Sequence, residues 1–116
     1  MKSIANIGLC LSLVVLPITA SAELLTGKNG MTLYTLAKDT PGKSACSWYC
    51  IKMWPPAEAG DAEGPQFGAM TREGGARQLT YAGKPLYYFS GDRKPGDANG
   101  DGIDQLWRVV TLAEFR

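Results

Sequence analysis

The chain repeats itself at a constant offset of 53 residues, and this repeat restricts its fold more than any other feature. Residues that recur in this way first serve folding, because each copy must bury the same apolar face. The differences between the copies are therefore the better guide to function. The offset pairs identical residues without a gap: Gly30 with Gly83, Leu33 with Leu86, Tyr34 with Tyr87, Asp39 with Asp92, and Trp54 with Trp107.

Residues 1–22 have the pattern of a cleaved secretory signal peptide. Lys2 supplies the positive end, residues 4–16 form an uncharged apolar run, and Ala20-Ser21-Ala22 is a small-residue cleavage site. The apolar run is shorter than the roughly 20 residues that a membrane-spanning helix needs. We therefore expect a periplasmic or secreted protein that begins at Glu23 and keeps no membrane anchor.

Residues 23–116 have the length of one small domain. Removing Lys2 from the twelve basic residues leaves eleven, equal to the eleven acidic residues, so the charge indicates neither a nucleic-acid partner nor an anionic membrane surface. The sequence contains no histidine, which excludes Ser-His and Cys-His nucleophile pairs and histidine-ligated zinc or haem. We expect a protein that is not an enzyme and that carries no cofactor.

Short runs of alternating apolar residues, separated by turn signals, predict an all-β antiparallel domain. The first copy, about residues 23–56, has the pattern of a hairpin that turns at Gly27-Lys28-Asn29-Gly30. The second copy, about residues 76–110, has the same pattern and turns at Ala82-Gly83-Lys84-Pro85. The fold is therefore predicted to be two fused, hairpin-centred repeats.

Further strands are expected at residues 66–72 and 106–110, and only residues 112–116 have a helical pattern. Two long irregular loops remain, at residues 39–64 and 92–105. Loops of this length in a small domain are usually functional, or held in place by something other than strand pairing. Candidate site residues are therefore sought there.

Cys46 and Cys50 are the cysteines that remain after signal cleavage, and in an exported chain they are expected to form a disulfide. The structural interpretation is a staple that closes a short loop and stabilises it by about 2 kcal/mol. The alternative is a redox pair, but no feature of the sequence indicates a lowered thiol pKa, and the spacing differs from that of thioredoxin-like motifs. The sequence favours the staple.

The staple encloses Trp48 and Tyr49, and a tight ring cannot easily turn both aromatic side chains inward. Aromatic side chains displayed on a rigid loop are frequent binding anchors. The alternative is that Trp48 folds back onto Trp54 as part of the core. Both interpretations stay open at this stage.

Within the glycine- and aspartate-rich loop at residues 92–105, the segment from Asp97 to Gly102 matches the first half of a calcium-binding loop, and Asp92 could contribute from outside it. Counted from Asp97, the twelfth position is Arg108, where a bidentate glutamate is needed. The alternative, which we favour, is a turn-rich connector whose acidic side chains cap backbone N–H groups. Asp92 is also a candidate binding residue, although its recurrence at Asp39 favours turn capping. The weak candidate ligands are Asp97, Asn99, Asp101 and Asp104.

In these motifs the chain resembles the bacterial secreted-repeat proteins, which share a Tyr-x-aromatic-x-x-Asp motif. Some members of that family are lipoproteins. Residues 87–92 match the motif fully, whereas residues 34–39 have Leu36 at the aromatic position. The resemblance extends to the two cysteines ahead of Trp54-Pro55-Pro56, and it implies an exported protein of a family without an established activity. Arg108 stands where members often carry histidine.

Together these patterns predict an exported, non-catalytic binding or interaction module with an unknown periplasmic protein or small ligand as its partner. The candidate contact residues are Trp48, Tyr49 and Asp92. The alternative function is a redox or metal-handling protein that uses the Cys46 and Cys50 pair or the loop from Asp97 to Asp104.

Overall fold

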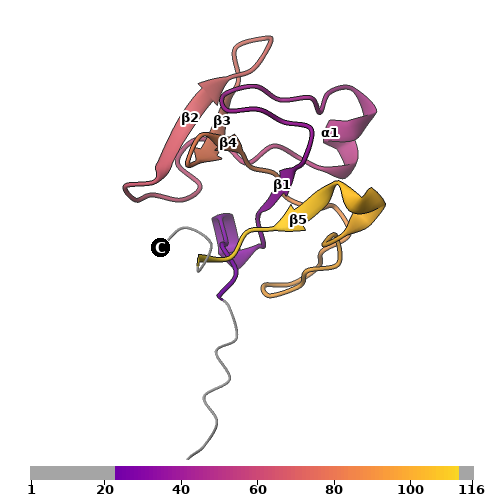
Figure 1. The fold of residues 1–116 in the computed structure, drawn as a ribbon. Coiled ribbons are helices and arrows are strands. Elements are labelled where there is room, and N and C mark those ends of the chain that lie inside the picture. Colours follow the sequence, from indigo (N-terminus) through magenta and orange to yellow (C-terminus); the bar gives the residue numbers. More distant parts are fainter. Residues whose placement is uncertain (1–22, 113–116) are drawn as a thin grey trace, which may run out of the picture.

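The computed structural model of the chain describes residues 23–112 (Figure 1). The expected signal peptide at residues 1–22 and most of the expected helical segment, residues 113–116, lie outside the described residues. The elements in chain order are η2 (Lys28–Gly30), β1 (Tyr34–Leu36), α1 (Tyr49–Met53), β2 (Phe67–Thr71), β3 (Arg77–Tyr81), β4 (Lys84–Pro85), η3 (Ile103–Gln105) and β5 (Trp107–Val109).

Short antiparallel strands form two small sheets, which confirms the predicted all-β class. One sheet has the order β2-β3-β4, with Ala69 opposite Leu79 in its longer pair. The other sheet pairs β1 with β5, with Thr35 opposite Arg108. Because β1 and β5 come from opposite ends of the chain, this second sheet joins the first copy to the second.

Both predicted hairpins turn at a pair of residues with left-handed backbone angles. Asn29 and Gly30 have φ values of 60° and 75°, and Ala82 and Gly83 have φ values of 50° and 85°. Glycine and asparagine favour such angles, and they suit tight hairpin turns. The second turn is shorter than expected, because Lys84–Pro85 already belongs to β4.

The two copies meet at Tyr34 and Tyr87, which exchange backbone hydrogen bonds. The N–H of Tyr34 donates to the carbonyl of Tyr87 at 2.8 Å, and the N–H of Tyr87 donates back at 3.0 Å. Each phenol hydroxyl then reaches the aspartate of the other copy. The Tyr34 hydroxyl donates to Asp92 at 2.7 Å, and the Tyr87 hydroxyl donates to Asp39 at 2.6 Å.

The repeated tryptophans form the centre of the core, as the repeat predicts. Trp54 and Trp107 are each 4% exposed and stack with ring centroids 3.8 Å apart. Tyr34 meets Trp54 edge to face at 5.3 Å, and Tyr87 meets Trp107 in the same way at 5.2 Å. Matching residues therefore bury matching surfaces around one approximate twofold axis.

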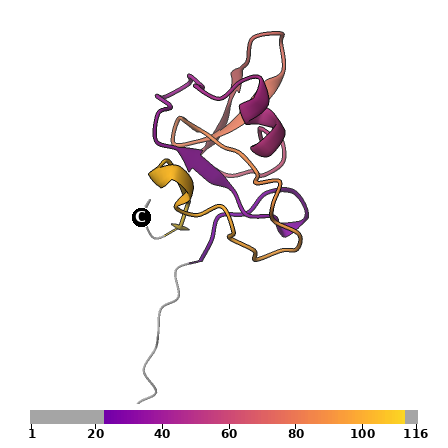
Figure 2. The ribbon, with the colours of Figure 1, turned by 90° about the vertical axis from the view of Figure 1, so that its right-hand side faces the viewer.

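A one-turn helix, α1, lies in the loop that was expected to be irregular, so that expectation was wrong for Tyr49–Met53. Five residues are too few for a helical period to be seen in a sequence, and isolated helices of this length are not stable on their own. Tertiary constraint holds α1 in place. Two views place α1 and the turn between β2 and β3 at the same end of the domain (Figure 1, Figure 2).

Candidate binding site

The predicted disulfide between Cys46 and Cys50 is present, and it closes the loop that carries α1. The α-carbons of the two residues lie 5.3 Å apart, within the range that disulfides require. Cys46 is fully buried beside the aromatic core, whereas Cys50 is half-buried. The disulfide therefore ties the first turn of α1 to the core.

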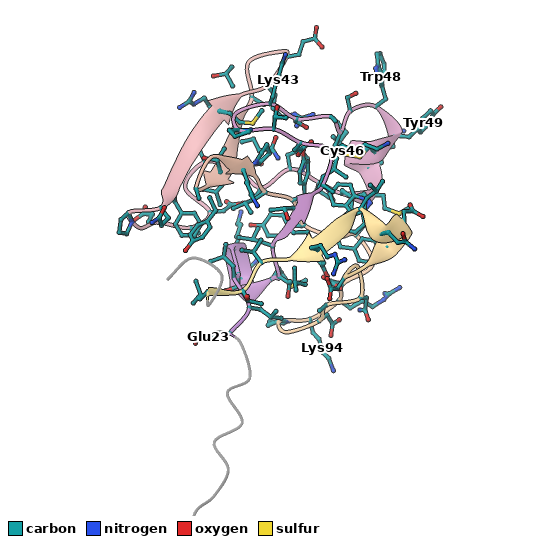
Figure 3. The ribbon with its side chains drawn as sticks, in the orientation of Figure 1. Glu23, Lys43, Cys46, Trp48, Tyr49 and Lys94 are labelled. Carbon is teal, nitrogen blue, oxygen red and sulfur yellow. A yellow bond between two sulfur atoms is a disulfide. The ribbon has the colours of Figure 1, made fainter. Side chains whose placement is uncertain are left out.

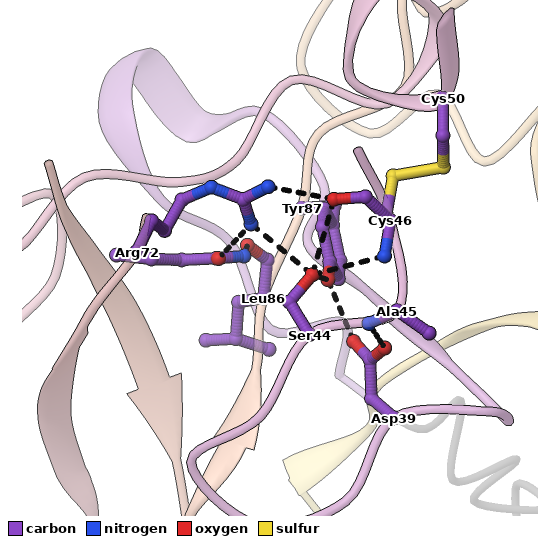
Figure 4. Close-up of a disulfide and its surroundings, with 9 residues drawn as sticks. Asp39, Ser44, Ala45, Cys46, Cys50, Arg72, Leu86 and Tyr87 are labelled. Carbon is purple, nitrogen blue, oxygen red and sulfur yellow. Dashed lines mark hydrogen bonds between the residues drawn. A yellow bond between two sulfur atoms is a disulfide. The ribbon is translucent and has the colours of Figure 1, made fainter. Parts of the chain in front are cut away.

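A guanidinium group fixes the same loop to the sheet from the other side (Figure 4). Arg72 donates to the carbonyl of Cys46 at 2.6 Å, to the side-chain oxygen of Gln78 at 2.6 Å and to Ser44 Oγ at 3.1 Å. Ser44 is in turn hydrogen-bonded to the hydroxyl of Tyr87. The base of the loop is thus connected to both sheets.

Asp39 completes this network from within the first copy. Its Oδ1 accepts the backbone N–H of Ala45 at 2.6 Å, while its Oδ2 accepts the hydroxyl of Tyr87. Burial raises the pKa of Asp39 above its ordinary value, against the lowering effects of these hydrogen bonds and of Arg72. Burial and the hydrogen bond to Asp39 also raise the pKa of Tyr87, so this tyrosine stays a neutral donor.

On this fixed base, Trp48 and Tyr49 project away from the domain (Figure 3). Each is 83% exposed, and Met53 on the same helical turn is 51% exposed. Trp54 stacks on Trp107, so the alternative in which Trp48 folds back onto Trp54 is wrong. Both aromatic side chains are displayed.

The backbone of Trp48 has angles that disfavour any side chain. Its φ is 58° and its ψ is −120°, and the N–H of Cys50 donates to the carbonyl of Ser47 at 3.0 Å. These angles belong to the first central position of a type II′ turn, where glycine dominates. A bulky residue at such a position costs of the order of 1 to 3 kcal/mol.

The second copy has a glycine at the matching position. Asp39 accepts the N–H of Ala45, and Asp92 likewise accepts the N–H of Asn99 at 2.9 Å, so the copies align here at an offset of 54. At that offset Trp48 corresponds to Gly102, which precedes η3 and has a φ of 87°. The ψ of Gly102 is −2° and that of Trp48 is −120°, so the two residues share a positive φ but not the same turn.

Beside these side chains lies a shallow hollow of about 360 Å³ lined by Trp48, Tyr49, Ile51 and Lys52. The ammonium group of Lys52 lies 5.3 Å from the centroid of the Tyr49 ring, a cation–π distance. Lys52 is a site residue that no sequence pattern predicted. Its place three residues after Tyr49 has meaning only once α1 is known.

The remaining predicted site residues lie in the loop of the second copy, remote in sequence from the disulfide. Asp92 is buried, and its two oxygens accept the Tyr34 hydroxyl and the Asn99 N–H. Asp97 accepts backbone N–H groups at 2.9 and 3.2 Å, which lowers its pKa. Asp101 accepts the N–H of Val109 at 3.0 Å, while Asp104 is exposed.

Across the described part of the chain, no three histidine, cysteine or acidic side chains are grouped as metal ligands.

Calcium titration tests the loop directly. Asp92, Asp97 and Asp101 already accept backbone or tyrosine donors. We therefore expect isothermal calorimetry to show no saturable calcium binding tighter than about millimolar, the weak extreme for extracellular sites. A micromolar site that Asp97→Ala abolishes would contradict this expectation.

Comparison with known families places these features in context. One family model, described as a secreted repeat of unknown function, matches the chain twice, at residues 19–58 and 68–111. The chain belongs to this family. The two matches confirm the resemblance and the pair of repeats, and the family description supports a secreted protein. No curated protein and no solved structure matches the chain. The helices among residues 23–112 are all too short to cross a membrane.

Proposed function

We propose that this secreted-repeat protein is a non-catalytic binding module of the bacterial periplasm, with Trp48 and Tyr49 as its contact residues. The observation that carries the proposal is the backbone of Trp48. A tryptophan that is 83% exposed contributes little to folding, yet it occupies a position that favours glycine. An exposed, strained residue that the fold does not need is a candidate for function.

Rigidity supports the same proposal. The disulfide and the hydrogen bonds of Arg72 hold both ends of the short segment that carries Trp48. A preorganised aromatic side chain loses little conformational entropy on binding, which improves affinity. Tryptophan and tyrosine are also the residues most enriched among binding hot spots.

Other features weigh against the alternative of a redox protein and against catalysis. Cys46 is fully buried and Cys50 is half-buried, so an attacking thiol can approach the disulfide only from the side of Cys50. The repeated aspartates Asp39 and Asp92 each accept a tyrosine hydroxyl and a backbone N–H. Such bonds give these carboxylates a structural role in both copies.

Capture from a cell-envelope extract tests the proposal. The immobilised wild-type domain is expected to retain a component of the extract. The Trp48→Gly variant should retain at least about tenfold less of it, because removal of a hot-spot tryptophan typically costs about 2 kcal/mol or more of binding free energy. Lys94→Gln is the matched control, because this exposed lysine lies in the loop of the second copy (Figure 3). Equal retention by wild type and Trp48→Gly would refute Trp48 as the contact residue.

A further inference from the structure

A second, polar hollow lies next to the displayed aromatic side chains. It has a volume of about 240 Å³, and its lining includes Lys43, Ser44, Ser47, Arg72 and Glu73. Ser47 lines this polar hollow, and the next residue, Trp48, lines the apolar one. Consecutive residues of the stapled turn therefore line the two hollows.

The polar hollow carries a net positive charge. Arg72 is held there by three neutral acceptors, the oxygens of Ser44, Cys46 and Gln78. Lys43 is exposed, and it adds a second cation to the lining. Glu73 is the one carboxylate of the lining, so the lining side chains sum to a single positive charge.

The half-buried carboxylate of Asp39 bonds to donors other than Arg72. Asp39 is close enough for Arg72 to affect its pKa, but its oxygens are bonded to Tyr87 and Ala45. Arg72 uses three hydrogen bonds of the five that a guanidinium can donate. The guanidinium group is therefore held in one orientation, and it still has N–H groups that these three bonds do not use.

We infer that the paired hollows bind a carboxylate attached to a ring, with the carboxylate beside Lys43 and Arg72 and one ring face on Trp48 or Tyr49. Within the polar hollow, the single net positive charge of the lining matches a monoanion better than a dianion, and Lys52 adds a cation on the apolar side. The apolar hollow, about 360 Å³, lies near the lower end of the range for small-molecule sites, which suits one ring. This inference rests on the proposed function and names its ligand class.

Carboxylated sugars and aromatic acids both have this chemistry, and matched probes distinguish them. N-acetylmuramic acid and N-acetylglucosamine share a ring and differ by one carboxylate-bearing group, while phenylacetate supplies an aromatic ring. Titrations are followed by the NMR signal of the Trp48 indole N–H. We expect at least one acid to saturate with a Kd of about millimolar or tighter, and the neutral sugar not to saturate.

Charge variants test the polar hollow separately from the aromatic contact. Lys43→Gln is expected to weaken binding of the acid by up to about fivefold, and Glu73→Gln to tighten it by a similar factor, as for exposed charge pairs. Both residues are exposed and lie outside the hydrogen-bond network of Arg72, so both variants should fold. Lys94→Gln again serves as the control and should change nothing.

The inference would be overturned by saturation with no acid up to about tens of millimolar, or by equal binding of the neutral sugar. Affinities unchanged in both Lys43→Gln and Glu73→Gln would also overturn it. If envelope material is nevertheless retained in a Trp48-dependent manner, the ligand class is wrong and the proposed function stands. If Trp48→Gly retains as much as wild type, the proposed function itself is wrong.

Discussion

Trp107→Ala is expected to lower the free energy of unfolding by about 3 to 5 kcal/mol, the usual cost of removing a large aromatic side chain from a core. Trp107 is 4% exposed, stacks on Trp54 and meets Tyr87 edge to face. The total free energy of unfolding of a small domain is about 5 to 15 kcal/mol. The variant should therefore be close to the limit of folding.

Urea denaturation followed by far-ultraviolet circular dichroism measures this loss without depending on tryptophan emission. Trp48→Ala is the matched control, because it removes the same atoms from an exposed site. Surface substitutions usually change stability by less than about 0.5 kcal/mol. Equal losses in the two variants would contradict the placement of Trp107 in the core.

Tyr34→Phe is expected to cost about 1 to 3 kcal/mol, because it leaves buried groups without their partner. The Tyr34 hydroxyl donates to buried Asp92 and accepts the N–H of Gly100 at 3.1 Å. Phenylalanine keeps the ring and its contacts with Trp54 and removes only the oxygen. The loss therefore reports the hydrogen bonds between the two copies.

A double-mutant cycle assigns this loss to the correct aspartate. Tyr34→Phe should couple to Asp92→Asn by 0.5 kcal/mol or more, the order found for residues in contact. Its effect should be nearly additive with that of Asp39→Asn, because Asp39 instead accepts the hydroxyl of Tyr87. Coupling of Tyr34 to Asp39 and not to Asp92 would contradict the crossed arrangement.

The features that sequence reasoning found are those that leave a pattern along the chain. Identical residues at one offset predict equivalent hairpins and the related positions of Trp54 and Trp107. The export signal and the cysteine count predict the disulfide, because two cysteines in an oxidising compartment pair. Alternation predicts that Tyr34 and Leu36 share a buried face, as they do.

Other features have no such pattern. A repeat at one offset is equally consistent with tyrosine–aspartate bonds within each copy and between copies, so the crossed exchange was not predictable. Arg72 contacts Cys46 across 26 residues of sequence, and nothing local marks that contact. The strain at Trp48 depends on backbone angles that the disulfide and the turn impose together.

The central claim is that Trp48 is present for binding and not for folding. The most direct test is the free energy of unfolding of Trp48→Gly, measured beside wild type. Relief of the left-handed strain, of the order of 1 to 3 kcal/mol, should match or exceed the backbone entropy cost of glycine, about 0.5 to 1 kcal/mol. We predict a variant at least as stable as wild type; a loss of more than about 1 kcal/mol would make Trp48 a folding residue and contradict the claim.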